Sequence, residues 1–288
     1  MRAERMVRLL SALVPEEGVL QDIVRGVDLF RITESFPRSP QKYDPGIIVL
    51  AQGRKRVYIG DEVYEYDPLN YLVVSVPLPL ECEVSAPKEK PLLGFKVKVD
   101  ATTVGELLLA LDDDQHTLKV VPQAIYSAPL DRLLIDASVR LLESLQSPND
   151  RRILAPMIAR EIIYRVLCGE KGDALRALAY RHQRFFQISR TLDKIHEMYG
   201  KKLDLTSLAR EAGMSISAFH SSFKAVTNIA PLQYIKNVRL HKARLLMVEE
   251  GLNANRAAYE VGYESPSQFN REYKRLFGLT PARDAIHA

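Results

Sequence analysis

The chain has 288 residues, of which 47% are hydrophobic and 26% are charged, and its net charge is +4. These values are typical of a soluble globular protein with room for two domains. The longest apolar run, YLVVSVPLPL, is interrupted by prolines and is far shorter than the roughly 18 residues of a membrane helix. A membrane protein is therefore not expected.

The N-terminus and the cysteines indicate a cytoplasmic protein. The first residues, MRAERMVRLLSALVPEEG, begin with basic side chains, but the apolar stretch is short and an acidic pair follows it. This pattern does not predict a signal peptide. Cys82 and Cys168 have neither a metal-binding nor a disulfide-like spacing, which fits a reducing compartment.

The positive charge is unevenly distributed. Residues 186–288 contain 15 Lys and Arg against 10 Asp and Glu, whereas residues 1–185 contain 25 against 26. A basic excess of this kind is expected where phosphates are bound, although a solvated surface explains a modest excess equally well.

Short β-strands are predicted between residues 46 and 100. Six segments rich in Val, Ile, Tyr and Leu are separated by Gly, Pro and Asp; they are PGIIVLAQG, KRVYIGD, EVYEYDP, YLVVSVP, LECEVSA and LLGFKVKVD. Gly60 and Asp61 separate two alternating runs as a hairpin turn would. Six or more short antiparallel strands predict a β-barrel or a jelly roll.

A small effector is one hypothesis for the interior of this barrel. Tyr58 and Tyr66 are candidate pocket residues, and Lys96 could bind an anionic ligand. The alternatives are ordinary packing of tyrosines and a barrel that is filled by its own side chains.

An enzyme is not expected. Metal-dependent barrels of this type use His and carboxylate ligands on adjacent strands, but none of the six His lies within residues 46–100. The sequence also lacks a Gly-x-Ser-x-Gly motif and a phosphate-binding Gly loop. We therefore predict no catalytic residue, no metal and no cofactor.

Helices follow the strands. Residues 102–111 form a short apolar segment, and residues 127–145 and 147–169 have apolar side chains at helical spacing. Both longer helices could simply pack on the barrel, or an exposed part of the first could contact a second subunit. Residues 170–190 then predict a further helix rather than a flexible linker, so the two halves of the chain are expected to be coupled.

Two stretches near the C-terminus repeat one another, which indicates two copies of one structural unit. They are GMSISAFHSSFKAVTNIAP and GYESPSQFNREYKRLFGLTP, and their matching serines, aromatic residues, lysines and prolines are 50 positions apart.

Each copy predicts a helix-turn-helix unit, at about residues 203–227 and 254–278. In each, a short helix ends at a glycine and a second helix begins at a serine cap, Ser215 or Ser265. Thr206 is the predicted cap of the first short helix. The second helices have buried aromatic stripes that include Phe219 and Phe269, and such a helix can enter the major groove of DNA.

A long helix is predicted between the copies, over residues 231–248. The 17 residues from Pro231 to Met247 give a length of about 25 Å at 1.5 Å per residue, so the helix could place two recognition helices roughly one DNA turn apart. We expect four of its side chains to face inward, namely Ile235, Val238, Leu245 and Leu246. Four others are expected in solvent, namely Lys236, Arg239, Lys242 and Arg244.

Residues 186–286 resemble the AraC/XylS family of bacterial transcription regulators, through GYESPSQFNREYKRLFGLTP and the preceding long helix. The segment PGIIVLAQGRKRVYIGDEVYEYDPLNYLVVSVPLP resembles the cupin-like N-terminal domain of one AraC subfamily.

This resemblance implies an α+β protein with three parts: a cupin-like regulatory and dimerisation domain (1–170), a helical linker (171–187) and an all-α DNA-binding domain (188–288). It implies a cytoplasmic, nucleoid-associated regulator that reads two successive major-groove segments. The expected partners are double-stranded DNA, a second copy of the chain, a small-molecule effector and, for an activator, RNA polymerase.

The resemblance also implies which side chains contact DNA. On the second recognition helix, Ser267, Gln268 and Arg271 occupy base-facing positions, although Arg271 could instead pair with a phosphate or a nearby acid. On the first, the candidates for base contacts are Ser217, His220 and Ser221. These are less selective than the large aromatic or arginine side chains that are usual in the family, and His220 could be a plain solvent-facing residue.

Three further residues are candidates for phosphate contacts, namely Lys224, Lys274 and Thr206. The alternative function is an effector-independent architectural protein that bridges DNA without strong sequence choice.

Overall fold

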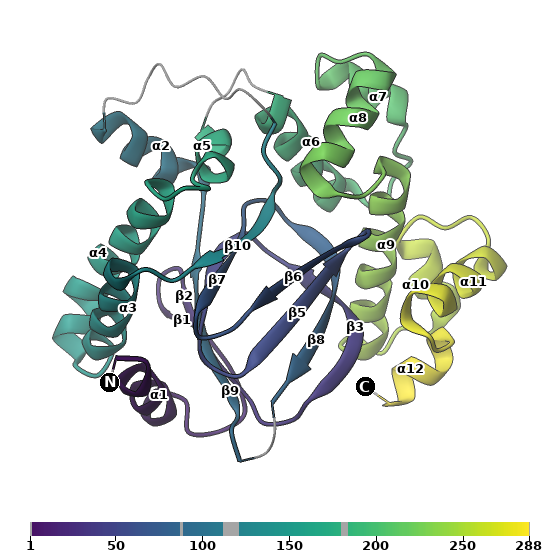
Figure 1. The fold of residues 1–288 in the computed structure, drawn as a ribbon. Helices are drawn as coiled ribbons and strands as arrows, with labels where there is room; N and C mark the ends of the chain where they lie inside the picture. Colours follow the sequence, from purple (N-terminus) through teal and green to yellow (C-terminus); the bar gives the residue numbers. More distant parts are fainter. Residues whose placement is uncertain (1, 87–88, 112–120, 180–183, 288) are drawn as a thin grey trace.

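The computed structural model describes residues 2–86, 89–111, 121–179 and 184–287. Two antiparallel sheets and flanking helices form the N-terminal part, and the C-terminal part is entirely helical (Figure 1). The predicted α+β class with a C-terminal tandem helix-turn-helix domain is confirmed.

The N-terminal part contains a six-stranded and a four-stranded sheet. The larger sheet has the order β1 (Gly18–Val24), β2 (Val27–Ile32), β9 (Leu92–Lys98), β4 (Gly46–Gln52), β7 (Asn70–Val74) and β10 (Ile125–Pro129). The smaller sheet has the order β3 (Phe36–Tyr43), β8 (Leu78–Ser85), β5 (Arg54–Ile59) and β6 (Glu62–Tyr66). In the part of the chain that the structure describes, no strand pairing joins the sheets, so they do not close into one continuous barrel. All six predicted strands form; β1, β2, β3 and β10 are additional.

Strand β4 lies at the centre of this fold. Its residues 46–51 are all buried, because the helix α1 (Arg2–Leu13) packs on β4 with Met6 and Leu10 while the strand has neighbours on both edges. A strand covered in this way has a continuous hydrophobic sequence instead of an alternating one.

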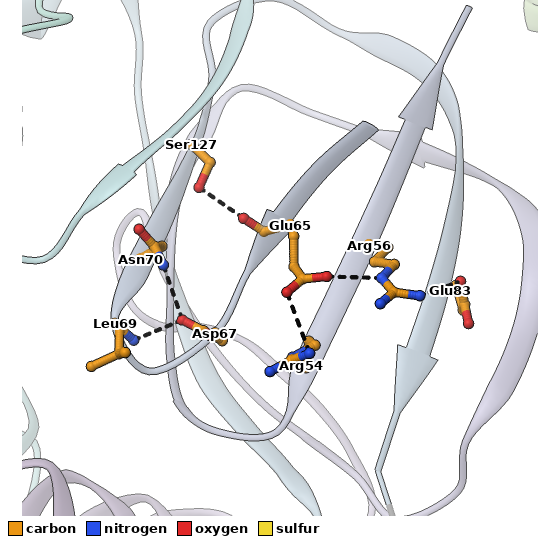
Figure 2. Close-up of polar contacts among 8 residues, drawn as sticks. All are labelled: Arg54, Arg56, Glu65, Asp67, Leu69, Asn70, Glu83 and Ser127. Carbon is orange, nitrogen blue, oxygen red and sulfur yellow. Dashed lines mark hydrogen bonds and ion pairs between the residues drawn. The ribbon is translucent and has the colours of Figure 1, made fainter. Parts of the chain in front are cut away.

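A polar cluster joins the two sheets beside the turn between β6 and β7 (Figure 2). Ser127 of β10 donates a hydrogen bond of 2.9 Å to the backbone oxygen of Glu65 on β6. The Glu65 carboxylate accepts from Arg56 at 2.8 Å, and Asp67 accepts from the backbone nitrogen of Leu69 at 2.9 Å. The cluster thus holds the edge of the smaller sheet against β10 of the larger one.

Four helices lie beside the larger sheet: α2 (Ala101–Ala110), α3 (Arg132–Ser144), α4 (Pro148–Leu167) and α5 (Asp173–Ala179). The helix predicted over 127–145 is wrong at its start. Residues 127–129 pair with β7, and the helix begins after Asp131, whose carboxylate accepts from the backbone nitrogen of Leu134 at 2.7 Å. Tertiary pairing with β7 therefore overrides the local helical pattern there.

The helical part consists of α6 (Arg184–Met198), α7 (Leu205–Glu211), α8 (Ile216–Thr227), α9 (Pro231–Val248), α10 (Ala254–Glu260), α11 (Pro266–Phe277) and α12 (Pro281–His287). It docks on the sheets through α8 and α9 (Figure 1). The backbone nitrogen of Ala124 donates to Val226 at 2.9 Å, and the hydroxyl of Tyr234 donates to the Pro77 carbonyl at 2.5 Å.

Predictions for both faces of α9 are wrong. Lys236, Lys242 and Arg244, expected in solvent, are partly buried. Leu245, expected inside, has 40% of its surface exposed. Arg239, expected in solvent, is partly buried, and its guanidinium donates to three backbone carbonyls: those of Tyr199 at 2.8 Å, Lys201 at 2.8 Å and Gly262 at 3.1 Å. The first two carbonyls follow α6 and the third lies in the turn before α11, so Arg239 joins the two helix-turn-helix units.

No helix in the described ranges is both long and apolar enough to cross a membrane.

We expect Arg239→Ala to lower the free energy of unfolding by about 2–3 kcal/mol, because two partly buried carbonyls and one exposed carbonyl lose a charged donor. The measurement is chemical denaturation followed by circular dichroism. Arg256→Ala is the matched control, since Arg256 is exposed on α10 and its side chain forms no ion pair or hydrogen bond with another described residue. Equal stability of the two variants would contradict a joining role for Arg239.

Candidate DNA-binding surface

The first helix-turn-helix unit consists of α7 and α8. Gly213 provides the turn with a φ of +67°, which costs glycine little. Ser215 caps α8 by accepting from the backbone nitrogen of Ala218 at 3.3 Å, and Phe219, Phe223 and Val226 are buried, as predicted.

The predicted cap of α7 is wrong. The cap is Asp204, whose carboxylate accepts from both the backbone nitrogen and the hydroxyl of Ser207 at 2.9 Å. Thr206 is an exposed residue in the first turn instead. Because a carboxylate accepts both hydrogen bonds, Asp204 occupies the capping position two residues earlier than expected.

The second unit, α10 and α11, is built in the same way. Ser265 accepts from the backbone nitrogen of Gln268 at 3.3 Å, Pro266 begins α11, and Gly278 ends it with a φ of +77°. Phe269 and Tyr273 are fully buried, as the stripe predicts.

The predicted DNA-contacting residues of α8 are all exposed: Ser217, His220, Ser221 and Lys224. Their spacing of three and four places them on one face of the helix. The Ser221 hydroxyl donates back to the Ala218 carbonyl at 3.1 Å, so it must rotate before it can donate to a base.

The corresponding residues of α11 are also exposed: Ser267, Gln268, Arg271 and Lys274. Gln268 donates to Glu272 at 3.1 Å, and Glu272 also binds Lys236 at 2.8 Å, so this amide is held in place before DNA arrives. Arg271 has no ion pair or side-chain hydrogen bond to any other described residue. Glu272, the acid next to Arg271 in the sequence, binds Gln268 and Lys236 instead of Arg271.

The structure does not bring the predicted effector residues together. Tyr66 is fully buried and its hydroxyl lies 3.2 Å from that of Tyr43. Tyr58 lies on the opposite face of the smaller sheet, where its hydroxyl donates to Glu83 at 2.6 Å. Lys96 is on the larger sheet. Side chains of β5 and β6 alternate between faces, so Tyr58 and Tyr66 cannot line one pocket.

A cavity of about 490 Å³ lies between the two parts of the molecule instead. Its lining comes from Pro40, Gln41 and Lys42 of β3, Pro79 of β8, His196 of α6, six residues of α9 (Val238, His241, Lys242, Arg244, Leu245 and Val248) and Glu249, which follows α9. Sequence reasoning missed this site because its residues lie in separate segments. The one signal for this site in the sequence was an apolar residue, Leu245, close to two cations of the same helix, Lys242 and Arg244.

The charges around the cavity are uneven. Lys42 pairs with Asp44 at 2.8 Å, and Arg244 pairs with Asp284 at 2.8 Å. Lys242 has no carboxylate partner among the described residues, and its ammonium lies 5.6 Å from the ring centre of Tyr199. The wall therefore combines the unpaired cation Lys242 with the exposed apolar side chains of α9, and it also contains the carboxylate of Glu249. A cation beside apolar side chains suits an amphipathic anion.

Both histidines of the cavity are neutral at neutral pH. Burial, and after it the charge of Lys42, lowers the pKa of His196 to about 4. Burial also lowers the pKa of His241 to about 4, with Arg244 as the next cause. No group of His, Cys, Asp and Glu within the described residues could hold a metal ion.

Two family models match the chain. A model of the N-terminus of AraC-type transcriptional regulators matches residues 23–174, and a helix-turn-helix domain model matches residues 208–284. Both concern regulators, so the prediction that the chain is not an enzyme is confirmed.

Curated relatives include the virulence regulon transcriptional activator VirF of Yersinia enterocolitica, which is 26% identical over 243 residues, 83% of this chain and 88% of VirF. The regulator ExsA of Pseudomonas aeruginosa is 30% identical over 154 residues, 52% of this chain and 54% of ExsA.

Among solved structures, an apo variant of ToxT from Vibrio cholerae has a TM-score of 0.57 at 10% identity, covering 94% of this chain and 98% of ToxT. ToxT bound to an unsaturated fatty acid has a TM-score of 0.56 at 12% identity, covering 94% of this chain and 96% of ToxT. At these identities the likeness concerns the fold. Because the N-terminal model matches more than half of its residues, the chain belongs to the AraC-type transcriptional regulators.

Proposed function

We propose that this DNA-binding regulator reads two successive major-groove segments with α8 and α11, under the control of an amphipathic carboxylate bound between its two parts. The observation that supports the DNA contacts best is the pair of exposed polar faces at matching positions of the repeat. In the second of these, Arg271 has no partner within the described residues.

The two faces differ in chemistry. Arg271 can bind a guanine with two hydrogen bonds and Gln268 an adenine, whereas Ser217, Ser221 and Ser267 discriminate less between bases. His220 can accept or donate one bond. Lys224, Lys274 and Thr206 are suited to phosphates, which position the protein without selecting a sequence. We therefore infer that α11 contributes most of the sequence specificity.

The spacing of the two helices supports the same proposal. Helix α9 has 18 residues, about 27 Å at 1.5 Å per residue, and Arg239 joins its two neighbouring units. A rigid spacer of this length is compatible with half-sites about one DNA turn apart, roughly 34 Å. The comparisons give no support to the architectural alternative, since the relatives are regulators.

The effector proposal is supported by ToxT, one of whose structures contains an unsaturated fatty acid. In this chain the cavity between the two parts has an unpaired cation, Lys242, and the apolar side chains of Leu245 and Val248. Its walls come from both sheet and helical parts. A ligand that contacts both can favour one arrangement of the DNA-binding helices over another, provided that it binds the two arrangements with different affinities.

A homodimer through α4 is part of the proposal. Ile153, Leu154 and Met157 are exposed by 56%, 43% and 64%, and Leu133 of α3 by 56%. An apolar face on neighbouring helices is suited to a second copy of the same face. If the protein activates transcription, as VirF is named to do, RNA polymerase is a further partner.

We expect Arg271→Ala to relax specificity at one base pair and to weaken binding of the preferred sequence by about 1–3 kcal/mol. Selection of bound genomic fragments, followed by titration of the recovered sequence by fluorescence anisotropy, measures both effects. Lys274→Ala is the matched control, because loss of a phosphate contact weakens all sequences alike. The same uniform loss in Arg271→Ala would reassign Arg271 to a phosphate.

We expect Lys242→Met to weaken the binding of 10-undecenoate, a short unsaturated fatty acid, about tenfold, because the carboxylate loses a charged donor worth roughly 1.4 kcal/mol or more. Isothermal titration calorimetry gives the affinity. Lys202→Met removes the same charge from an exposed position outside the cavity and should have no effect. Equal affinities of both variants would exclude the cavity as the carboxylate site.

We expect Met157→Glu to convert a dimer into a monomer, because a carboxylate would be buried in an apolar contact. Light scattering coupled to size exclusion measures the mass. Asn255→Glu adds the same charge to an exposed position on α10 and should leave the dimer intact. A wild-type mass equal to that of one chain at all concentrations would contradict the dimer itself.

A further inference from the structure

The hydrogen bonds of His196 determine which of its ring nitrogens has the proton. Nε2 of His196 lies 2.9 Å from the hydroxyl oxygen of Tyr234, and this hydroxyl lies 2.5 Å from the carbonyl oxygen of Pro77. A carbonyl only accepts, and a tyrosine hydroxyl has one hydrogen, so Tyr234 donates to Pro77. Its oxygen must then accept from Nε2–H of His196.

This tautomer leaves Nδ1 of His196 as an acceptor. Nδ1 is buried and has no hydrogen-bond partner among the described residues. A buried polar atom without a partner is costly, by about 1–3 kcal/mol. His196 also lines the cavity between the two parts of the molecule. Because Nδ1 itself has no exposed surface there, a ligand can supply the missing hydrogen bond only when the imidazole ring turns or a neighbouring side chain moves aside.

Charged groups from several elements surround His196 and His241. The cavity wall contains the cations Lys42, Lys242 and Arg244 and the carboxylate of Glu249. Two of the cations are paired with acids outside the lining, Lys42 with Asp44 and Arg244 with Asp284. The titratable and charged groups around the two histidines are Lys42 and Asp44 at the end of β3, Glu81 of β8, Asp193 of α6, Lys224 of α8, Tyr234, Lys242 and Arg244 of α9, Glu249 after α9, and Asp284 of α12.

We propose that binding of a carboxylate effector in this cavity is coupled to the uptake of one proton, held between the carboxylate and Nδ1 of His196. The inference rests on the effector site proposed above. It adds that the regulator senses effector and acidity together through a single residue.

The proton is needed because two acceptors would otherwise meet. A carboxylate oxygen and the bare Nδ1 both offer lone pairs and repel each other. One proton from solvent converts this contact into a charge-assisted hydrogen bond, whether it resides on Nδ1 or on the ligand oxygen. In either case the complex contains one more proton than the neutral histidine and the ionised ligand did separately.

The direction of the pH dependence follows from linkage. Since the pKa of His196 without ligand is about 4, the free protein has no proton on Nδ1 between pH 6 and pH 8. A bound carboxylate raises this pKa, so the complex takes up a proton as the pH falls. Reciprocity then requires the carboxylate to bind more tightly at low pH.

The test is calorimetry of the full chain with 10-undecenoate at pH 6, 7 and 8, in buffers with different enthalpies of ionisation. The dependence of the heat on the buffer gives the number of protons taken up. We expect a number that approaches one at pH 6 and falls toward zero at pH 8, with binding about three- to tenfold tighter at pH 6.

Two histidine variants assign the proton. His196→Gln keeps an N–H donor for Tyr234 but does not titrate, so it should bind 10-undecenoate without proton uptake and with the same affinity at each pH. His241→Gln changes the other histidine of the same cavity and should retain the uptake. Thermal melting of each variant confirms that it is folded.

The outcomes separate the inference from the function on which it rests. If 10-undecenoate does not bind to the wild type, the effector site is wrong and the inference with it. If it binds without proton uptake, the site stands and the proton coupling is overturned. Uptake that persists in His196→Gln and disappears in His241→Gln would overturn the assignment to His196.

Discussion

The guanidinium of Arg239 is the contact on which the arrangement of the DNA-binding surface depends. It binds two carbonyls of the segment between α6 and α7, which leads into the first unit, and one carbonyl in the turn of the second unit, so one side chain of α9 holds both segments. The turn fits closely: a Cβ on Gly262 would lie 2.8 Å from the carbonyl oxygen of Gly200. Only glycine allows this approach, and the spacing of α8 and α11 follows from it.

The same helix connects DNA binding with the sheets. Tyr234 bonds to Pro77, and Asn228, which ends α8 in a left-handed conformation, donates to Tyr64 at 3.1 Å. These bonds fix the C-terminal end of α8 on the N-terminal part. A ligand between β3 and α9 would therefore act on an element that contacts both helix-turn-helix units, which gives an effector a direct route to the DNA-binding surface.

The cavity owes its properties to this docking. His196 and Lys242 belong to the helical part, while Lys42 and Pro79 belong to the sheets. Removal from water makes both cavity histidines neutral at physiological pH. In the proposed effector site, Lys242 would bind the carboxylate and His196 would accept the proton, while the sheets supply the opposite wall of the cavity.

The sequence by itself determined the elements whose signals are local. Ser215 and Ser265 as caps, Gly213 and Gly278 as turn residues, and the aromatic stripes of α8 and α11 each depend on a few neighbouring residues, and the repeat reinforced them. The exposed positions proposed to contact DNA followed from the same periodicity, because a buried stripe also defines the opposite face.

Tertiary structure decided the rest, because burial and partners come from distant segments. Arg239 was expected in solvent, since nothing near it in the sequence shows the three carbonyls that surround it. Residues 127–129 became a strand only because β7 was available for pairing. Tyr58 and Tyr66 were separated by the pleat of the sheet, and the cavity required β3, α6 and α9 to meet, which no local pattern specifies.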